Sequence, residues 1–465
     1  MKFAGINLRE ATMNRSGPHS GGPKLNRRSV LAAGLAAGGG LGLPLFAPSL
    51  ARAADYPPLG TYPAGVSGDS CFVGLTPPLT GAYSADGKDH SLGYQLAIAQ
   101  INDGGDIPAK WGLKGKGVLG KTIRYKIADS ELKPNVAVQA QTQFIEQDKA
   151  IMISGCVSSA TAIALEELAQ RMKVVNMVGC SGSNDTTGKD CQRYGFRSQP
   201  SAYMAAMALG PVVAKAFGSN RKVAYLVPDY TYGFSVFDSF SAATKKYGWA
   251  ITTKQVVPVG AADYSSALIN IANSGADIFC NICFGNDSVA SSKQADQFGV
   301  LKKMKMVVPN ISSFQAQELG ARIMGGVYGT FDFWWTLEDT YPLAKDFVDS
   351  FYAVNKYRPS WGAHIAYMQT YIWALTVERA GTFYPVEVIK AFEASQSNPY
   401  DSSLGKVWYR AEDHQMVRPV PVALGKTPSE MKSSDDYFTV VEMVPGAQVI
   451  NPVSDLMGCK LGAYT

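Results

Sequence analysis

Apolar and polar positions change their spacing many times along the chain, and each change marks a short predicted element. TIRYKIADSE, residues 122–131, alternates apolar with polar residues and predicts a strand. NVAVQAQTQFIEQ, residues 135–147, follows Pro134 with helical spacing, and KAIMISGCV, residues 149–157, is almost wholly apolar, as in a buried strand. Strands that alternate with helices of these lengths are typical of parallel sheets with crossover helices.

This alternation occurs twice. A first run ends near Gly179, and the pattern restarts after Arg197 with a helix over 202–217 and a strand over 222–229. Two successive runs predict an α/β fold with two doubly wound parallel-sheet lobes. Further predicted elements are helices over 90–103, 235–247, 344–355 and 363–380, a strand-like stretch over 325–335, and short strands in an irregular tail.

The last third of the chain does not continue the alternation, so we expect it to cross back and complete both lobes through a hinge of several crossings. The predicted first lobe is 66–200 plus 333–418. The predicted second lobe is 201–332 plus 419–465, and residues 1–53 form a leader.

The stretch GKGVLGKT, residues 115–122, fits two nucleotide-binding patterns, G-x-x-x-x-G-K-[ST] and G-x-G-x-x-G. Both patterns require a strand before the glycines and a helix after them, whose amino end binds the phosphate. Here the loop PAKWGLK precedes the stretch, and the predicted strand IRYKIAD follows it. We therefore predict a flexible connection with a turn at Gly120, and no nucleotide site.

The formal charge of +5 comes from the first residues of the chain. Residues 1–53 contain seven Lys and Arg and one acidic residue, so the remainder has 36 basic and 37 acidic residues. Arg27 and Arg28, a glycine-rich apolar stretch and Ala51-Arg52-Ala53 resemble a twin-arginine export signal cleaved near Ala53. A transmembrane anchor is the alternative, although Pro44 and five glycines interrupt the stretch. The near-neutral remainder gives no sign of a nucleic-acid partner.

The chain has seven cysteines. Cys180 and Cys191 flank the polar, turn-rich segment SGSNDTTGKD, and we predict a disulfide between them, since disulfides persist outside the cytoplasm. Cys280-x-x-Cys283 could be a redox or metal-binding pair. It lies in the apolar run ADIFCNICFG, however, where buried small hydrophobic residues are the favoured interpretation. The odd total leaves at least one thiol unpaired unless the protein dimerises through it.

Five motifs in register carry a resemblance to a known family. They are VGLTPPLTGAYSADG, GYQLAIAQINDGG, GKTIRYKIADSELKPNVAV, ISGCVSSATAIAL and the Tyr-Gly of PDYTYGFS. Together they resemble the leucine/isoleucine/valine-binding family, the type I periplasmic solute-binding proteins of ABC importers. The similarity covers about residues 71–329 and is weaker to about residue 425. It implies two lobes that close on a small solute by hinge motion.

The resemblance also implies a set of ligand-binding residues. In the family, turns at the carboxyl ends of strands hold the ligand between the lobes. Ser158 and Ser159 match a serine turn that binds a ligand carboxylate, and Gly179 and Ser181 match the next turn. Tyr232 matches the tyrosine that closes over the ligand. Ser158 could instead only cap the following helix, and Tyr232 could only pack at the rim.

Three further positions depart from the family. Phe284 stands where relatives often have tyrosine and could simply be a core residue, while Asp86 stands where they often have an aromatic residue. Asn310 replaces the Glu or Asp that often neutralises the ligand's ammonium, and burying an ammonium without a countercharge is costly. Either Asp86, Asp229 or Asp287 supplies that charge, or the solute is an amide, a urea-like compound or a carboxylic acid. The aromatic run FDFWW, residues 331–335, would suit an aromatic or apolar ligand, or equally the packing of a hinge.

We therefore expect a periplasmic binding protein, monomeric and without cofactor or metal, that delivers a small solute to an ABC permease in the inner membrane by transient contact. An exported hydrolase is the alternative from another class, and a receptor-type sensing protein is a third. Against a hydrolase, G-x-S-x-G is absent, and His90, His364 and His414 lack metal-ligand spacing. We expect no enzymatic activity and no catalytic residues.

Overall fold

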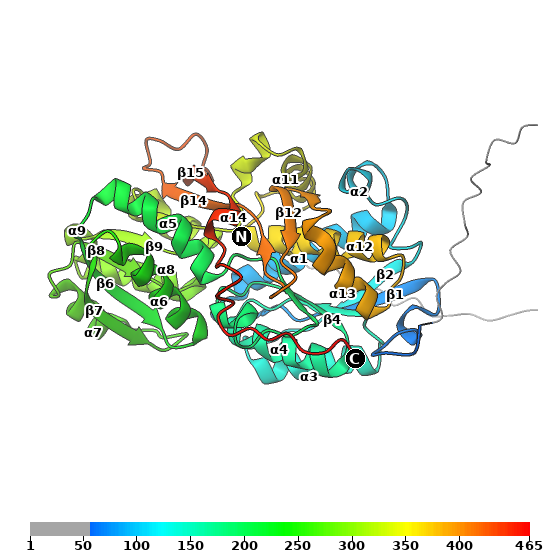
Figure 1. Cartoon of the computed structure of the whole chain (residues 1–465). Coiled ribbons are helices and arrows are strands. Elements are labelled where there is room, and N and C mark those ends of the chain that lie inside the picture. Colours follow the sequence, from blue (N-terminus) through cyan, green and yellow to red (C-terminus); the bar gives the residue numbers. More distant parts are fainter. Residues whose placement is uncertain (1–55) are drawn as a thin grey trace, which may run out of the picture. The chain divides into compact units, whose positions relative to one another are not determined.

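A computed structural model describes residues 56–465 of the chain (Figure 1). The predicted leader, with its paired arginines and cleavage pattern, lies outside the described residues. Between residues 56 and 465, no helix combines the length and the apolar character that crossing a bilayer requires.

A five-stranded parallel sheet forms the centre of the first lobe. Its strand order is β2-β1-β3-β4-β5. The strands are β1 (Ser70–Leu75), β2 (Thr122–Ile127), β3 (Met152–Ser154), β4 (Val175–Val178) and β5 (Gly195–Arg197). β3 and β4 are buried along their whole length, because helices cover both faces of a parallel sheet, and this explains their continuous apolar sequence.

Helices pack on both faces of this sheet. α3 packs against α4 on one face, and α1 packs against α12 on the other (Figure 1). The helices of the first lobe are α1 (Ser84–Asp103), α2 (Asp106–Trp111), α3 (Pro134–Glu146), α4 (Ser159–Met172), α11 (Pro342–Asn355), α12 (Trp361–Ala380) and α13 (Pro385–Glu393). Gly93 permits the close approach of α1 and α12, since a Cβ atom there would lie 2.1 Å from the carbonyl oxygen of Ala363.

A seven-stranded sheet forms the centre of the second lobe. Its order is β15-β14-β10-β9-β8-β6-β7, with β14 and β15 antiparallel to their neighbours and the other strands parallel. The strands are β6 (Lys222–Pro228), β7 (Ala250–Val257), β8 (Ile278–Asn281), β9 (Lys305–Val308), β10 (Tyr328–Thr330), β14 (Val420–Gly425) and β15 (Phe438–Val444). The helices are α5 (Ala202–Phe217), α6 (Thr231–Lys245), α7 (Ser265–Ala272), α8 (Gly285–Gln297), α9 (Val300–Lys303), α10 (Ser313–Met324) and α14 (Gly446–Val449).

The chain passes between the two lobes after β5, after β10 and after a small antiparallel sheet. The strands of that sheet are β11 (Tyr400–Ser402), β12 (Gly405–Tyr409) and β13 (Met416–Val417). The short 3-10 helices are η1 (Ala64–Val66), η2 (Asn184–Thr187), η3 (Trp335–Asp339) and η4 (Ala394–Gln396). Two α/β lobes with mainly parallel sheets confirm the predicted fold class, while the exact lobe boundaries stay predictions.

The last residues of the chain return to the first lobe, although the prediction gave 419–465 to the second. β14 and β15 do pair in the second sheet. Beyond them, Arg193 Nε donates a hydrogen bond to the Gly462 carbonyl at 2.9 Å, and the Tyr464 hydroxyl donates to Glu393 at 2.5 Å. Gln170 Nε2 donates to the Ala463 carbonyl at 3.0 Å.

A disulfide fixes this tail, and it corrects the predicted Cys180–Cys191 pair. Cys191 is bonded to Cys459, with Cα atoms 5.5 Å apart, and Cys180 is a free buried thiol. The Cys180 N–H donates to the Cys156 carbonyl at 2.7 Å, which holds Cys180 at the end of the sheet, away from the tail. The short sequence separation of Cys180 and Cys191 was a weak reason to pair them, because the entropy cost of closing a loop grows only logarithmically with loop length. Cys280 and Cys283 are free and buried, as predicted.

Several element boundaries differ from those predicted. α1 and α6 begin at Ser84 and Thr231, earlier than the sequence indicated, because their first turns belong to loops at the strand ends. β10 ends at Thr330, and the aromatic residues after it form the crossing between the lobes. The glycine stretch 115–122 connects α2 to β2, so the strand after it is as predicted. The segment before it was predicted as a loop, but its residues 108–111 belong to α2.

Candidate functional site

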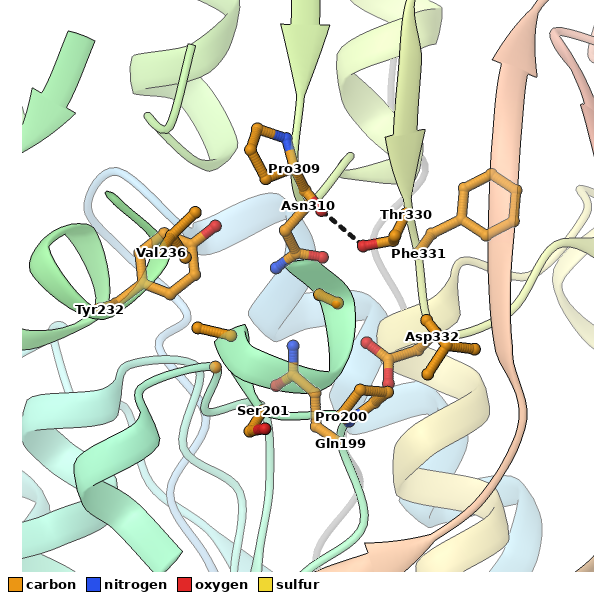
Figure 2. Close-up of a pocket in the computed structure, with 14 residues that line it drawn as sticks. Gln199, Pro200, Ser201, Tyr232, Val236, Pro309, Asn310, Thr330, Phe331 and Asp332 are labelled. Carbon is orange, nitrogen blue, oxygen red and sulfur yellow. Dashed lines mark hydrogen bonds between the residues drawn. The ribbon is translucent and has the colours of Figure 1, made fainter. Parts of the chain in front are cut away.

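Strand ends from both lobes surround two small neighbouring cavities. The first, which we call the helix-end cavity, lies where several helices begin. Its lining residues are Val157, Ser158, Ser159, Cys180, Gly182, Gln199, Tyr230, Tyr232, Phe284, Asn310 and Trp361. The second, the side cavity, is shown in Figure 2 and shares Gly182, Gln199, Tyr232 and Asn310 with the first. The first lobe and the second lobe thus contribute to one connected candidate site.

The side cavity has a more apolar wall. Besides the four shared residues, its lining comprises Pro200, Ser201, Ala202, Ala205, Val236, Pro309, Thr330, Phe331, Asp332 and Val420. Each cavity has a volume of about 20 Å³, which is room for about one water molecule. A larger solute can therefore enter only if the two lobes separate.

Contacts between the lobes hold this narrow arrangement. The Tyr83 hydroxyl donates to the Tyr230 hydroxyl at 3.2 Å, and Trp361 Nε1 donates to the Ile311 carbonyl at 2.8 Å. Ser312 Oγ donates to Asp86 Oδ1 at 3.0 Å. Further hydrogen bonds join the lobes beside the site, such as Ser183 Oγ to Thr231 Oγ1 at 2.7 Å and the Asn286 N–H to the Ala82 carbonyl at 3.1 Å. Contacts of this kind would have to break when the lobes open.

The serine turn of the first lobe has hydroxyl groups in the helix-end cavity. Ser158 is the N-cap residue of α4, but its side chain makes no capping hydrogen bond, so the structure does not support a purely capping role. Ser159 Oγ accepts a hydrogen bond from the Ser183 N–H at 3.1 Å, which leaves its own proton free to be donated. Both hydroxyls can therefore donate to an acceptor in the cavity.

Four helices begin at this cavity. The N-cap residues of α4, α6 and α8 are Ser158, Tyr230 and Phe284, which all line it and make no side-chain cap, and Trp361 is the first residue of α12. The first N–H groups of a helix have no partner within the helix, and its amino end has a partial positive charge. The α12 end is already capped, because Ser360 Oγ accepts from the Ala363 N–H at 3.2 Å and the Trp361 N–H donates to Ser313 Oγ at 3.3 Å. The three ends without a side-chain cap create an environment that favours an anion.

Acidic side chains are absent from the lining of the helix-end cavity. Asp332 lines the side cavity, where Oδ1 accepts a hydrogen bond from Arg418 at 3.2 Å; burial raises the pKa of Asp332 to about 7, while Arg418 opposes that shift. Its charge is therefore already paired in the ionised form.

The three aspartates that could have served as countercharges lie elsewhere. Asp86 is fully buried, and burial raises its pKa to about 7 against the opposing hydrogen bond from Ser312. Asp287 accepts a hydrogen bond from the Gly260 N–H at 2.8 Å, and burial raises its pKa as well. Asp229 is exposed. In this arrangement none of the three lines either cavity.

Five of the eight predicted ligand-binding residues lie together in the helix-end cavity: Ser158, Ser159, Tyr232, Phe284 and Asn310. Gly179, Ser181 and Asp86 line neither cavity. Ser181 Oγ is hydrogen-bonded to Thr186 Oγ1 at 2.7 Å, and a Cβ atom at Gly179 would meet the Cys156 carbonyl at 2.3 Å. These two residues hold the turn in position, and any contact with ligand stays a prediction.

The sequence interpretation missed Gln199, Tyr230 and Trp361. Gln199 lies at the first crossing between the lobes, a stretch without periodic pattern. Tyr230 is the N-cap residue of α6, and Trp361 is the first residue of α12. Their positions at predicted helix starts were the only sequence signal that could have indicated them. In the run FDFWW, Phe331 lines the side cavity, whereas Phe333 stacks on His364 with ring centroids 4.0 Å apart.

Comparison with known proteins identifies the family of the chain and relatives that share its fold. The profile of the family described as periplasmic binding protein matches residues 70–427. The chain belongs to this family. Leu/Ile/Val-binding protein homolog 8 of Brucella abortus (strain 2308) is 25% identical over 229 residues, 48% of this chain and 54% of that protein. The match thus spans about half the length of that curated relative, and the resemblance stated from the sequence is confirmed.

Two solved structures share the fold of this periplasmic binding protein. An amino acid ABC transporter substrate-binding protein from Pseudomonas fluorescens Pf-5 has a TM-score of 0.74 at 24% identity, covering 85% of this chain and 100% of that one. A solute binding protein of an ABC transporter from Rhodopseudomonas palustris BisB5, in complex with 3,4-dihydroxy benzoic acid, has a TM-score of 0.70 at 20% identity, covering 81% and 97%.

Two of the histidines of the described part of the chain lie apart from the cavities. Between residues 56 and 465, no three His, Cys, Asp or Glu side chains gather as a metal site would require. His414 Nε2 lies 3.0 Å from Glu393, and His364 Nε2 lies 2.6 Å from Ser403 Oγ; both histidines are buried away from the two cavities. The family itself is one of binding proteins.

Proposed function

We propose that this chain is the exported substrate-binding component of an ABC importer, and that it binds a small carboxylate solute without an ammonium group. The observation that carries the proposal is the set of three helix starts without a side-chain cap around a cavity with no acidic lining residue. An ammonium there would face partial positive charges and no countercharge, whereas a carboxylate would be stabilised.

The carboxylate would lie against the serine turn. Ser158 and Ser159 would donate hydroxyl protons, and the first N–H groups of α4 would donate as well. The aromatic rings of Tyr230, Tyr232 and Phe284 would cover the solute from the second lobe and exclude water. This division is consistent with small ligand sites, where a few polar groups orient the ligand within a mainly apolar wall.

Binding would be coupled to closure of the lobes. The cavities are too small for a solute to pass, and the crossings after β5, β10 and β13 would form a hinge about which the lobes could move. The closed form would then dock on a permease in the inner membrane. Export to the periplasm is supported by the twin-arginine pattern, the cleavage pattern and the family.

The ligands of structural neighbours support the solute class. One of the two solved neighbours is bound to 3,4-dihydroxy benzoic acid, a carboxylic acid without an ammonium, and the other belongs to an amino acid transporter. Asn310, where amino-acid binders of this family often have an acidic residue, favours the former class here.

Calorimetry on the purified chain tests the proposal, after mass spectrometry of any solute released by denaturation. Benzoate, isovalerate and leucine serve as probes. We expect a carboxylate to bind more tightly than leucine, and Ser158→Ala or Ser159→Ala to weaken its binding about tenfold each, since a hydrogen bond to a charged group contributes about 1.5–3 kcal/mol.

Ser266→Ala, at an exposed position on α7, is the matched control and should leave the affinity unchanged. Tighter binding of leucine than of either acid would refute the solute class. Wild-type affinity in both serine variants would refute the assignment of the serine turn.

A further inference from the structure

The Gln199 side chain lies at the junction of the two cavities without a hydrogen-bond partner. Gln199 is only 3% exposed, and its Oε1 atom has no partner among residues 56–465. Its backbone carbonyl accepts a hydrogen bond from Gln415 Nε2 at 2.9 Å, so the residue itself is well anchored. An amide this deeply buried is usually satisfied, because leaving it unpaired is unfavourable.

The Tyr232 hydroxyl shares this property. Tyr232 is 4% exposed, and its hydroxyl also lacks a hydrogen-bond partner among the described residues, although Asn310 lies nearby. Figure 2 shows the Gln199 and Asn310 amides extending toward one another across the side cavity, with the Tyr232 hydroxyl directed toward Asn310. Three neutral polar groups therefore converge where the two cavities meet.

The Gln199 and Asn310 amides and the Tyr232 hydroxyl favour an uncharged polar group on the solute. An amide presents one acceptor and one donor group, and a tyrosine hydroxyl can both donate and accept. None of the three supplies a charge that could compensate a buried ammonium, and the nearby Asp332 is paired with Arg418. A hydroxyl group fits all three, because it donates one hydrogen bond and accepts others.

The surroundings define what joins the hydroxyl to the rest of the solute. On one side is the helix-end cavity, which favours a carboxylate. On the other, the side cavity presents Ala205, Val236 and Pro309. A solute that spans both cavities would therefore have a carboxylate end, a hydroxyl at the junction and an apolar body.

We propose that the preferred solute is a hydroxy-substituted carboxylic acid, and that Gln199 is the residue that recognises its hydroxyl group. This inference rests on the proposed function, which supplies the carboxylate end. Tyr232 and Asn310 complete the recognition of the hydroxyl, and an acid without that group leaves their polar atoms unpaired in the closed site. Sites built to bond a ligand hydroxyl reject the analogue that lacks it much more strongly than apolar pockets reject an extra group.

Matched ligand pairs test the inference by calorimetry on the full exported chain. The probes are benzoate with 3,4-dihydroxybenzoate, and isovalerate with 2-hydroxyisovalerate. We expect the wild-type protein to bind the hydroxy acid of at least one pair about tenfold or more tightly than its partner. In Gln199→Leu that ratio should fall to about threefold or less, and in Tyr232→Phe it should fall by a smaller factor.

Gln143→Leu, at an exposed position on α3, is the control and should retain the wild-type ratio. Equal binding of both members of each pair by the wild-type protein would overturn the inference and leave the proposed function standing. A Gln199→Leu variant that loses affinity for both acids of a pair by the same factor would likewise overturn the inference and leave the proposed function standing. If neither acid of either pair binds the wild-type protein, the inference and the carboxylate proposal both fail. The wild-type comparison decides even if Gln199→Leu does not fold.

Discussion

The two walls of the candidate site are built from different kinds of residue. The first-lobe wall has mainly small or polar side chains beside the one large ring of Trp361, with Ser158, Ser159 and Gln199 as its hydrogen-bonding groups. The second-lobe wall is mainly aromatic, with Tyr230 and Tyr232 at ring-centroid distances of 5.6 Å. The first wall can therefore recognise polar atoms, and the second can exclude water from them.

The two walls are also held in different ways. Behind the first wall, the fully buried Arg197 donates hydrogen bonds to the carbonyl groups of Ser181 and Ser183 and fixes the turn that supports Ser159. The second wall is held by ring packing, such as the edge contact of Phe284 with Tyr83 at 5.2 Å across the lobes. A hydrogen-bonded wall suits fixed geometry, while ring contacts between lobes can form and separate during closure.

The largest effect is expected from placing a charge on the second wall. Asn310→Asp should weaken carboxylate binding about 100- to 1,000-fold, because two like charges a few ångströms apart in a protein interior repel by several kcal/mol. Asn310→Leu, similar in volume but uncharged, should weaken it far less. Calorimetry at pH 7 compares the two, and a lower pH that protonates the new carboxyl should restore part of the affinity. Unchanged binding in Asn310→Asp would contradict the anion-binding site.

The second effect concerns the covalent tie between the tail and the loop behind the first wall. Cys459→Ser removes the disulfide to Cys191 and should lower the free energy of unfolding by about 2–3 kcal/mol, because the unfolded chain gains freedom. Denaturant unfolding with and without reductant measures this. The wild-type protein should lose stability in reductant and the variant should not, and a wild-type protein indifferent to reductant would count against the bond.

The smallest effect is expected at Asp86, which links the lobes behind the site through Ser312. Burial raises the pKa of this carboxyl from 3.8 to about 7, so the native state holds the proton more tightly than the unfolded chain. Its contribution to the free energy of unfolding therefore falls as pH rises from about 4 to about 7 and is constant above.

Asp86→Asn removes this titration. When the pH is raised from 4.5 to 7.5, we expect the free energy of unfolding of the variant to rise by at least about 1 kcal/mol relative to that of the wild-type protein. Unfolding curves at both pH values give the difference. A variant with the same pH dependence as the wild-type protein would mean that Asp86 does not titrate in this range.

Most of the architecture could be predicted from the chain alone, because the signals are local. β3, β4 and β9 are short, largely buried strands, and an uninterrupted run of mainly apolar residues in the sequence predicts both their length and their burial. The serine turn and the Tyr232 turn could be located because they follow such strands directly. The starts of α1 and α6 were placed too late, since their first turns are polar or glycine-containing and lack a periodic signal.

The candidate site could be predicted only in part. Ser158, Ser159, Tyr232, Phe284 and Asn310 lie at strand ends that a motif can mark. Gln199 and Trp361 both line the helix-end cavity, one from a crossing and the other from the start of helix α12, and no local sequence pattern indicates either. Their roles depend on which strand ends face one another across the lobes.

The sequence by itself determined the order of strands and helices, the two-lobed α/β class and the turns that could hold a ligand, because periodicity and turn chemistry act over a few residues. The tertiary structure alone decided that Cys191 bonds Cys459, that four helix starts meet around one cavity, and that the Gln199 amide faces it unpaired. Those features join residues far apart in the chain. Their meeting depends on how the two sheets and the tail pack, and no short stretch of sequence encodes that packing.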